Sequence, residues 1–334
     1  MATIVKNIKK NEYPIPQDTI ELCKKIGVLK HLPTTTPKDL TFELHNTTTE
    51  MANALRRCIN SELEVLIMDF DDKDIESDDS FIITHELRKR INYIPIRQIS
   101  GLTFSVNVKN NTDEIIPVYS RSIKEKKNKD DEKMFSETFI LSYLRPGKHL
   151  IINNINIISG VAYKNNASFS FPGKVGYKCL DILGEDKIGP GGEIIKPSSM
   201  IIDSTKYRLS VHRQKYIDPV HIVKMALKTL NNKLDKIYKI VKETQENFYS
   251  PEMEINYLNG KANFKLFDET YTIGNLISKY GFYQDGTLTN IHCIKLHPSF
   301  KYVNIEIHHE DPRAIIMMSI EKIKKELSSI GSAF

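Results

Sequence analysis

Hydrophobic residues recur along the chain with two spacings, at every second position as in strands and at every third or fourth position as in helices. The segment 41–58 starts with alternating residues, passes through a polar stretch and ends in an apolar stripe, which predicts a strand, a turn and a helix. Thr47 and Glu50 have the spacing of a capping box at the start of that helix. The stripe consists of Met51, Leu55, Cys58, Ile59, Leu63 and Leu66. Alternation at 102–108 predicts strands in the middle of the chain as well.

The first pattern recurs at an offset of 222 residues, where the segment 263–280 aligns with 41–58 without a gap. Identical residues at matching positions are Phe42 and Phe264, Leu44 and Leu266, Thr48 and Thr270, and Asn53 and Asn275. A repeat of this kind predicts two copies of one structural unit. We expect Asn53 and Asn275 to form local hydrogen bonds where the turn packs against the helix.

Each copy is followed by a second predicted helix. Asp218-Pro219 and Asp311-Pro312 both place an N-capping carboxylate before a proline at the first helical position. Apolar residues then follow at steps of three or four, namely Val220, Val223, Leu227, Leu230, Leu234, Ile237 and Val241 in the first helix and Ile316, Ile320, Ile323, Leu327 and Ile330 in the second. Such narrow seams are typical of helices that pack against helices. Each seam could instead cover its own sheet, but two such helices in one chain favour mutual packing, and hence a pseudo-two-fold dimer within one polypeptide.

Length and composition are those of a globular protein of about two domains, with 334 residues of which 40% are hydrophobic. No apolar run reaches the roughly 20 residues that span a bilayer, and the polar N-terminus does not resemble a secretion signal. The four cysteines lie far apart, which indicates neither a disulfide framework nor a metal knuckle and suggests a reducing compartment. The net charge of +5 identifies no partner, because the basic stretch 124–133 also contains acidic residues and is typical of a solvated loop.

Three motifs of catalytic or metal-binding appearance are incomplete. His85-Glu86 starts like a metalloprotease helix, but Lys89 stands where the second histidine ligand would be, so we interpret it as an exposed turn before a strand at 91–96. Residues 308–311 (His-His-Glu-Asp) fit the end of a strand passing into a helix cap better than a metal site. Residues 189–192 (Gly-Pro-Gly-Gly) lack the ending of a phosphate loop and read as a surface loop. With no nucleophile motif either, the sequence predicts no catalysis, no cofactor and no bound metal.

The repeated segments resemble the RNA polymerase α family, which includes the bacterial α subunit's N-terminal domain, the archaeal D and L subunits, and the third and eleventh subunits of eukaryotic polymerase II. In the first copy, residues 53–57 (NALRR) are similar to the family's signature helix, and residues 90–96 (RINYIPI) are similar to its R-I-G-L-I-P-I stretch. Residues 144–177, which begin with LRPGK, resemble the family's inserted domain, although its K-G-I-x-K-x-H-A motif has decayed and its metal-binding cysteines are absent. In the second copy, residues 268–276 (DETYTIGNL) and the later His-Pro pair are similar to the family's smaller partner.

The resemblance implies an α+β fold with the α-like dimerisation fold in two pseudo-symmetric copies and a mostly β domain inserted in the first copy. The expected parts are an N-terminal arm at 1–37, a first dimerisation domain at 38–96 plus 205–245, an inserted domain at 97–204, a linker at 246–253 and a second, smaller dimerisation domain at 254–334. The helices of the internal pseudo-dimer would meet through Val223, Leu227, Leu230, Leu234 and Ile237 on one side and Ile316, Ile320, Ile323 and Leu327 on the other.

The resemblance also implies a non-catalytic assembly subunit of a DNA-directed RNA polymerase, fused as in large DNA viruses. Arg56 and Arg57 would face the second-largest subunit, a role that suits the planar, bidentate guanidinium group. The largest subunit and a small zinc-binding subunit like the tenth of polymerase II would be further partners, and nucleic acid would be contacted only through the complex. We expect the protein in the cytoplasm, including a viral factory or virion, or in the nucleus, and not in a membrane.

Other functions stay open. Because a fold does not determine function, the chain could be a free-standing nucleic-acid-binding or regulatory protein, and Arg56 and Arg57 could be ordinary solvated residues. Steeply salt-dependent nucleic-acid binding by the isolated chain would favour that alternative. A metal-dependent enzyme is disfavoured, because the spacing of the histidines supplies no ligand set.

Overall fold

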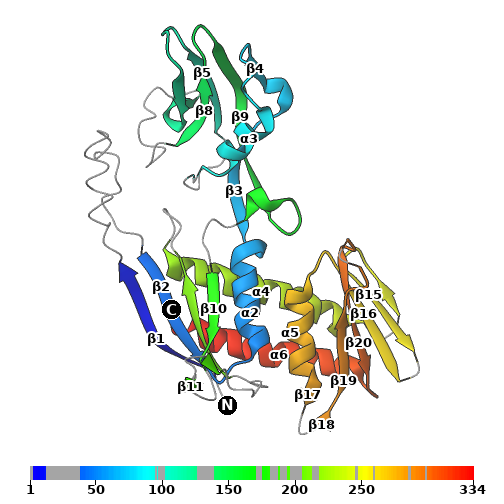
Figure 1. The fold of residues 1–334 in the computed structure, drawn as a ribbon. Coiled ribbons are helices and arrows are strands. Elements are labelled where there is room, and N and C mark those ends of the chain that lie inside the picture. Colours follow the sequence, from blue (N-terminus) through cyan, green and yellow to red (C-terminus); the bar gives the residue numbers. More distant parts are fainter. Residues whose placement is uncertain are drawn as a thin grey trace.

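Helices and strands of about equal extent make up an α+β fold, shown in Figure 1. This computed structural model describes residues 3–12, 38–94, 96, 102–125, 139–170, 175–180, 187–188, 194–195, 205–212, 218–244, 247–258, 260–284, 287–297 and 299–334. Several expectations lie outside these ranges in whole or in part, among them most of the N-terminal arm, the loop 189–192, most of the loop 124–133 and the start of the linker.

The first sheet is antiparallel, with the strand order β1–β2–β13–β10. Its strands are Ile4–Glu12, Lys38–His45, Lys206–Val211 and Val175–Cys179. In β2, every second side chain (Leu40, Phe42, Leu44) is buried, as the alternation predicts. The region expected as a separate arm therefore contributes an edge strand, β1, to the first sheet.

The second sheet is also antiparallel, with the strand order β14–β15–β16–β20–β19. Its strands are Phe248–Tyr249, Met253–Leu258, Lys261–Phe267, Tyr302–His308 and Asn290–Ile294. The strand β14 falls inside the expected linker, so part of that segment belongs to this sheet. Strand β20 ends at His308, just before the helix cap, as predicted for residues 308–311.

Four helices lie between these two sheets (Figure 1). They are α2 (Thr49–Arg57), α4 (Pro219–Glu243), α5 (Tyr271–Phe282) and α6 (Pro312–Gly331). The Asp-Pro signals are confirmed, because the Asp218 and Asp311 side chains accept hydrogen bonds from backbone N–H groups in the first turns of α4 and α6. Helix α4 contacts α6, and α2 contacts α5, so each helix meets its counterpart.

The two copies of the repeat agree in local detail. Helices α2 and α5 begin at matching residues, Thr49 and Tyr271. The turns before them contain Asn46 and Asp268, also matching positions, which have positive φ angles of 57° and 53°. Asn and Asp tolerate this left-handed conformation better than other non-glycine residues. We call the first sheet with α2 and α4 the first unit, and the second sheet with α5 and α6 the second unit. In both units the strand before the turn (β2 or β16) pairs with the strand (β13 or β20) that precedes the longer helix, α4 or α6.

The first signature helix is shorter than the apolar stripe predicts. After Arg57 the chain makes a π-helical turn, Cys58–Glu62, and then enters strand β3, Glu64–Asp69. The assignment of Leu63 and Leu66 to the helix was therefore wrong, although Leu63 is buried. The stripe continued past the helix end because β3 also has buried apolar residues.

A third sheet projects away from the helices (top of Figure 1). Its order is β3–β9–β5–β7, with β4 also paired to β9, and a two-stranded β6–β8 ribbon lies beside it. The strands β9, β5, β7, β4, β6 and β8 are His149–Val161, Thr103–Lys109, Ile123–Glu125, Ile75–Ser77, Ile116–Tyr119 and Ile140–Leu144. Phe104 and Val106 of β5 are buried, as the alternation predicts. We call 64–161 the projecting domain.

The segment 68–94 packs in this projecting domain and not with the first sheet. Met68, Leu87 and Ile91 share a hydrophobic cluster with Phe104 and Leu150, separate from the cluster between the two large sheets. Residues 84–92 form helix α3 (Thr84–Asn92), so the expected turn at His85 and strand at 91–96 were wrong. The cause is that Leu87 and Ile91 are one helical turn apart and face the same core.

In the part of the chain that the structure describes, no helix is both long and apolar enough to cross a membrane. Nor do three or more His, Cys, Asp and Glu side chains of those residues gather closely enough to hold a metal ion.

Candidate docking and pairing site

Helix α2 starts at a threonine cap. The Thr48 hydroxyl accepts a hydrogen bond from the Met51 N–H at 3.1 Å, and this satisfies a free donor of the first turn. The capping box at Thr47 and Glu50 is therefore wrong by one residue. Thr47 instead donates from its hydroxyl to Glu326 Oε1 of α6, at 2.5 Å. This polar stretch thus serves both the local helix and a contact with the second unit.

Arg56 is half-buried on α2 and is oriented by its own helix. Its Nε and Nη2 atoms donate to Asn53 Oδ1 at 3.1 and 2.8 Å. Asn53 therefore makes a local hydrogen bond, one helical turn from its partner. The matching Asn275 lies exposed on α5, next to the buried Gly274. A Cβ atom at Gly274 would lie 2.4 Å from Cys293 Sγ, so close helix–sheet contact excludes a larger side chain there.

Arg57 points to the other unit. Its Nε atom donates to the hydroxyl of Thr272 in α5, at 3.2 Å. Of the two arginines predicted to face a large subunit, Arg57 therefore contributes to the contact between α2 and α5, while Arg56 bonds within α2.

A buried polar cluster joins the two units next to Arg57. Lys233 of α4 donates to Glu62 Oε2 and to Glu269 Oε2, both at 2.9 Å. The other oxygen of Glu62 accepts from the hydroxyls of Thr270 and Thr272, at 3.0 and 2.5 Å. We call these five residues the Lys233 junction. Glu62 and Lys233 belong to the first unit and the other three to the second.

The environment of Lys233 favours its charged form. Only 13% of its side chain and 1% of the Glu62 side chain are exposed. Burial alone would lower the pKa of Lys233, but the carboxylates of Glu269 and Glu62 outweigh burial and raise that pKa above its ordinary value. The hydroxyl of Tyr163, beside the projecting domain, accepts a further hydrogen bond from Lys233 at 3.3 Å.

A second polar cluster lies around Glu326 of α6, and we call it the Glu326 junction. Besides the Thr47 hydroxyl, Glu326 accepts a hydrogen bond from the hydroxyl of Tyr280 at the end of α5. Burial, and then the Glu326 charge, raise the pKa of Tyr280, so this hydroxyl stays protonated and acts as the donor.

The two junctions occupy matching places in the two units. Lys233 follows Pro219, and Glu326 follows Pro312, by the same number of residues. Their partners in the opposite unit, Glu269 and Thr47, are also matching positions of the repeat. Sequence reasoning missed these polar residues, although the equal spacing after the two Asp-Pro pairs was a usable signal.

Helices α4 and α6, which carry the residues of the predicted seam, contact each other. All nine residues of the seam are buried in the same hydrophobic cluster, with exposed fractions of 6% or less: Val223, Leu227, Leu230, Leu234, Ile237, Ile316, Ile320, Ile323 and Leu327. That cluster also takes in side chains of both large sheets, so the two units share one core.

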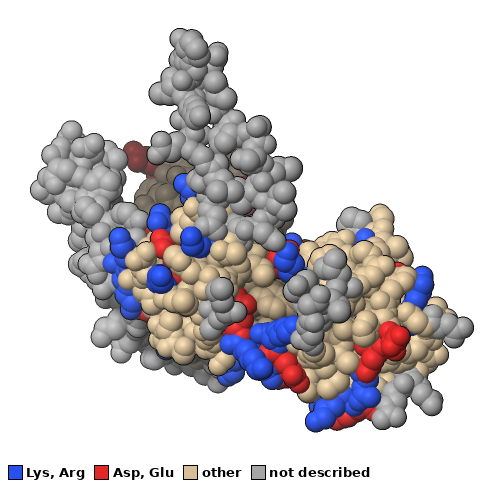
Figure 2. Space-filling view, turned by 90° about the horizontal axis from the view of Figure 1, so that it is seen from below, with Lys and Arg blue, Asp and Glu red and all other residues tan. Residues whose placement is uncertain are grey.

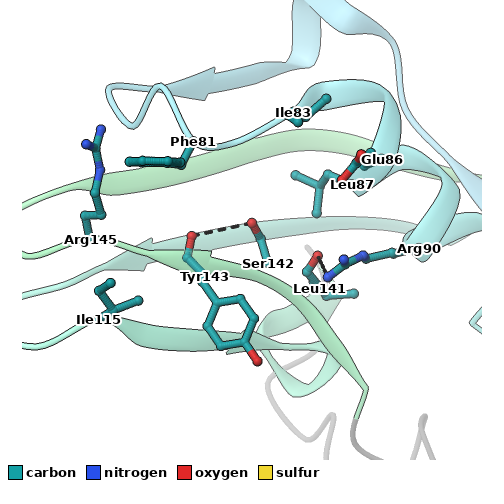
Figure 3. Close-up of a pocket in the computed structure, with 10 residues that line it drawn as sticks. All are labelled: Phe81, Ile83, Glu86, Leu87, Arg90, Ile115, Leu141, Ser142, Tyr143 and Arg145. Carbon is teal, nitrogen blue, oxygen red and sulfur yellow. Dashed lines mark hydrogen bonds between the residues drawn. The ribbon is translucent and has the colours of Figure 1, made fainter.

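The projecting domain carries a groove of about 440 Å³ between α3 and β8 (Figure 3). Phe81, Ile83 and Tyr143 line it and are largely exposed. Arg145, from the LRPG stretch, has a structural role at its rim: its Nε donates to the buried Asp79 at 2.9 Å, and its guanidinium lies 4.3 Å from the Phe81 ring. Clustered exposed apolar side chains are typical of surfaces that contact other molecules.

Part of the sequence matches a known family model. The model describes the RNA polymerase Rpb3/Rpb11 dimerisation domain and matches residues 41–234, more than half of the chain. The chain belongs to this family.

Relatives in the Rpb3/Rpb11 family cover most of the chain. The DNA-directed RNA polymerase RPB3-11 homolog of African swine fever virus, isolate Warthog/Namibia, is 30% identical over 266 residues, which are 73% of this chain and 72% of the relative. The protein of the same description from isolate Tick/Malawi is 27% identical over 322 residues, or 90% of this chain and 87% of the relative. The resemblance to the polymerase α family is thereby confirmed. An alignment that covers 90% of this chain leaves out fewer residues than the second unit contains, so it extends into that unit.

Proposed function

We propose that this chain is the non-catalytic assembly subunit of a DNA-directed RNA polymerase, and that its two units form a pseudo-dimer within one polypeptide. The observation that carries the proposal is the single core shared by two sheets with corresponding central strand pairs (β2–β13 and β16–β20), with α4 packed against α6, in a chain of the Rpb3/Rpb11 dimerisation family. Fusion makes the pairing intramolecular, with an effective concentration on the order of millimolar for a short connection.

The domain division that we propose follows the two cores. The first unit comprises the described residues of 3–62 and 162–244, and the second unit those of 247–334. The projecting domain, 64–161, is inserted in the first unit, with β3 and β9 as its connection. The inserted domain thus begins about thirty residues earlier than the boundary at 96 that the family motif suggested, because 68–94 supply part of its core.

The docking surface that we propose for the second-largest polymerase subunit is α2 with Arg56. Arg56 is half-buried and held in place by Asn53, so little side-chain entropy is lost when its guanidinium binds a carboxylate or backbone carbonyls of a partner. Arg57 supports the same surface indirectly, through its bond to Thr272. The largest subunit and a small zinc-binding subunit are the other partners that we propose.

The test is capture of the second-largest subunit by the purified full chain. We expect Arg56→Ala to weaken capture about tenfold or more, since anchoring arginines often contribute upwards of 2 kcal/mol to an interface. Lys301→Ala, which removes an exposed positive charge from the second unit, is the matched control and should bind normally. Normal capture by a folded Arg56→Ala protein would exclude this docking surface.

The rival function, free-standing nucleic-acid binding, is tested in the same preparation. On the face shown in Figure 2, basic and acidic side chains of the described residues lie interspersed. Weak nucleic-acid binding at physiological salt is therefore the expected result for the isolated chain. Tight binding that falls steeply with salt, together with failure to capture the large subunit, would favour the rival.

A further inference from the structure

The two junctions are alike in position but opposite in charge. In each junction, a charged residue of α4 or α6 contacts a residue of its own unit. It also contacts a residue of the other unit, two positions before the start of α5 or α2. In the Lys233 junction this contact is an ion pair of Lys233 with Glu269, and in the Glu326 junction it is a hydrogen bond from Thr47 to Glu326. We propose that this difference is a pairing code, which favours the pairing of a first unit with a second unit and disfavours the pairing of two second units from different copies of the chain. The inference rests on the pseudo-dimer proposed above.

The code follows from exchanging partners at matching positions. If two second units met with the same geometry, each Glu326 would face the other unit's Glu269, and two pairs of carboxylates would be forced together. If two first units met, each Lys233 would face Thr47 and would lose the carboxylate of Glu269. Lys233 keeps Glu62 and Glu326 keeps Tyr280 in any pairing, because these contacts lie within one unit. Only the mixed pairing gives Lys233 a carboxylate, and Glu326 a hydroxyl donor, from the opposite unit. Like charges brought together in this way are a common means of excluding wrong partners.

Burial makes the code effective. Exposed ion pairs contribute little, but a buried charge that loses its partner is strongly destabilising. The exposed fractions of the Lys233 and Glu269 side chains are only 13% and 17%. Glu62 is deeper still, and its oxygens already bond Lys233, Thr270 and Thr272. A wrong residue at position 269 therefore disturbs a connected set of groups and not a single surface contact.

A charge-reversal series on the full chain tests the attractive part of the code. We expect Lys233→Glu and Glu269→Lys each to lower the urea midpoint clearly. Because Lys233→Glu also brings a carboxylate against Glu62, the double variant should regain only part of the loss, but its loss should be clearly smaller than the sum of the two single losses. The pair Glu254 and Lys265, at 3.2 Å in the same unit and about a quarter exposed, is the matched control, and its reversals should change the midpoint little. Singles without effect, or a double variant as unstable as the sum of the singles, would overturn the attractive part.

A gain of self-association tests the repulsive part. Glu326→Lys turns the contact between two second units from Glu–Glu into Lys–Glu, whereas Glu326→Gln removes the charge without creating an attraction. Light scattering of the full chains should show dimers of Glu326→Lys that dissociate as salt is raised, while Glu326→Gln and the wild type stay monomeric under the same conditions. Equal behaviour of the two variants would overturn the code.

These measurements use the isolated chain and are independent of polymerase capture. If the pairing results hold while the wild type binds no large subunit, the polymerase role fails and the code stands. If capture succeeds while the charge variants behave like the control pair, the pairing code is wrong but the proposed polymerase role stands.

Discussion

The two hydrophobic cores of this molecule differ in what they hold together. The larger core takes its side chains from both units, from Leu40 in β2 to Ile330 near the end of α6. Among the residues that the structure describes, the smaller core takes its buried side chains from 68–155, within the projecting domain. A core that is shared cannot be completed by either unit alone, so the two units should open together. The projecting domain closes its own core and can open separately, as cooperative units of one protein often do.

The difference shows what fusion means in this chain. The two units share one core, so we expect them to fold as one unit, while the projecting domain is connected to them through the paired strands β3 and β9. A mutation in the larger core should therefore destabilise both units, whereas a mutation in the smaller core should destabilise the projecting domain alone.

The largest effect is expected from Phe42→Ala in the larger core. Phe42 of the first sheet lies edge-on against Phe334 at the end of the chain, with 4.9 Å between ring centroids, and only 1% of it is exposed. Loss of a buried phenylalanine typically lowers the free energy of unfolding by about 3–5 kcal/mol. Hydrogen exchange followed by mass spectrometry should show faster exchange in α5 and α6 as well as in α2. Faster exchange confined to the first sheet would contradict a shared core.

A somewhat smaller and local effect is expected from Leu150→Ala. Leu150 of β9 is fully buried in the smaller core, and such a truncation typically lowers the free energy of unfolding by about 2–5 kcal/mol. Exchange should rise in α3 and β5, while α4 and α6 keep the protection that they have in the wild type. If α4 and α6 also lost protection, the two cores would be a single cooperative unit.

The smallest effect concerns acid sensitivity. Hydrogen bonds from Arg208, then from His45 and Asn7, lower the pKa of Glu43 in β2 to about 2. Because that pKa is lower in the folded than in the unfolded chain, the stabilisation is complete above about pH 4.5 and is lost as the pH falls towards about 2. Arg208 is half-exposed, so we expect an effect of about 1 kcal/mol or less.

Glu43→Gln should therefore flatten the pH dependence of unfolding of the two units between about pH 4.5 and 2. Asp79 provides the counterpart in the projecting domain: burial would raise the pKa of Asp79, but hydrogen bonds from Arg145 and Phe81 outweigh burial and lower it. Asp79→Asn should change the pH dependence of hydrogen-exchange protection in α3 and β8 alone. Identical profiles for the two variants would contradict the separation of the cores.

Much of the fold could be predicted from local patterns. Some features can be read from short stretches of sequence, and the structure contains each of them. They are the strand–turn–helix pattern of the repeat, the two Asp-Pro helix starts and the alternation in β2 and β5. The family resemblance named the domain type correctly. The segment 84–92 was mispredicted because it contains few apolar residues, and Leu87 and Ile91 alone give a weak helical pattern.

The pairing residues could not be predicted in the same way. Glu62 and Lys233 are 171 residues apart, and Thr47 and Glu326 are 279 apart, so no local spacing brings them together. Their polar side chains would ordinarily be assigned to solvent. Arg57 illustrates the same limit, since the motif indicated a docking role while its hydrogen bond is to Thr272 of the second unit.

The central claim is that this chain assembles a polymerase, and affinity purification from its native source tests it most directly. The full chain, tagged at its N-terminus, should co-purify with two very large subunits in about equal amounts and with DNA-directed RNA polymerase activity. Recovery of the chain alone, or with nucleic acid and no large subunits, would contradict the assembly role.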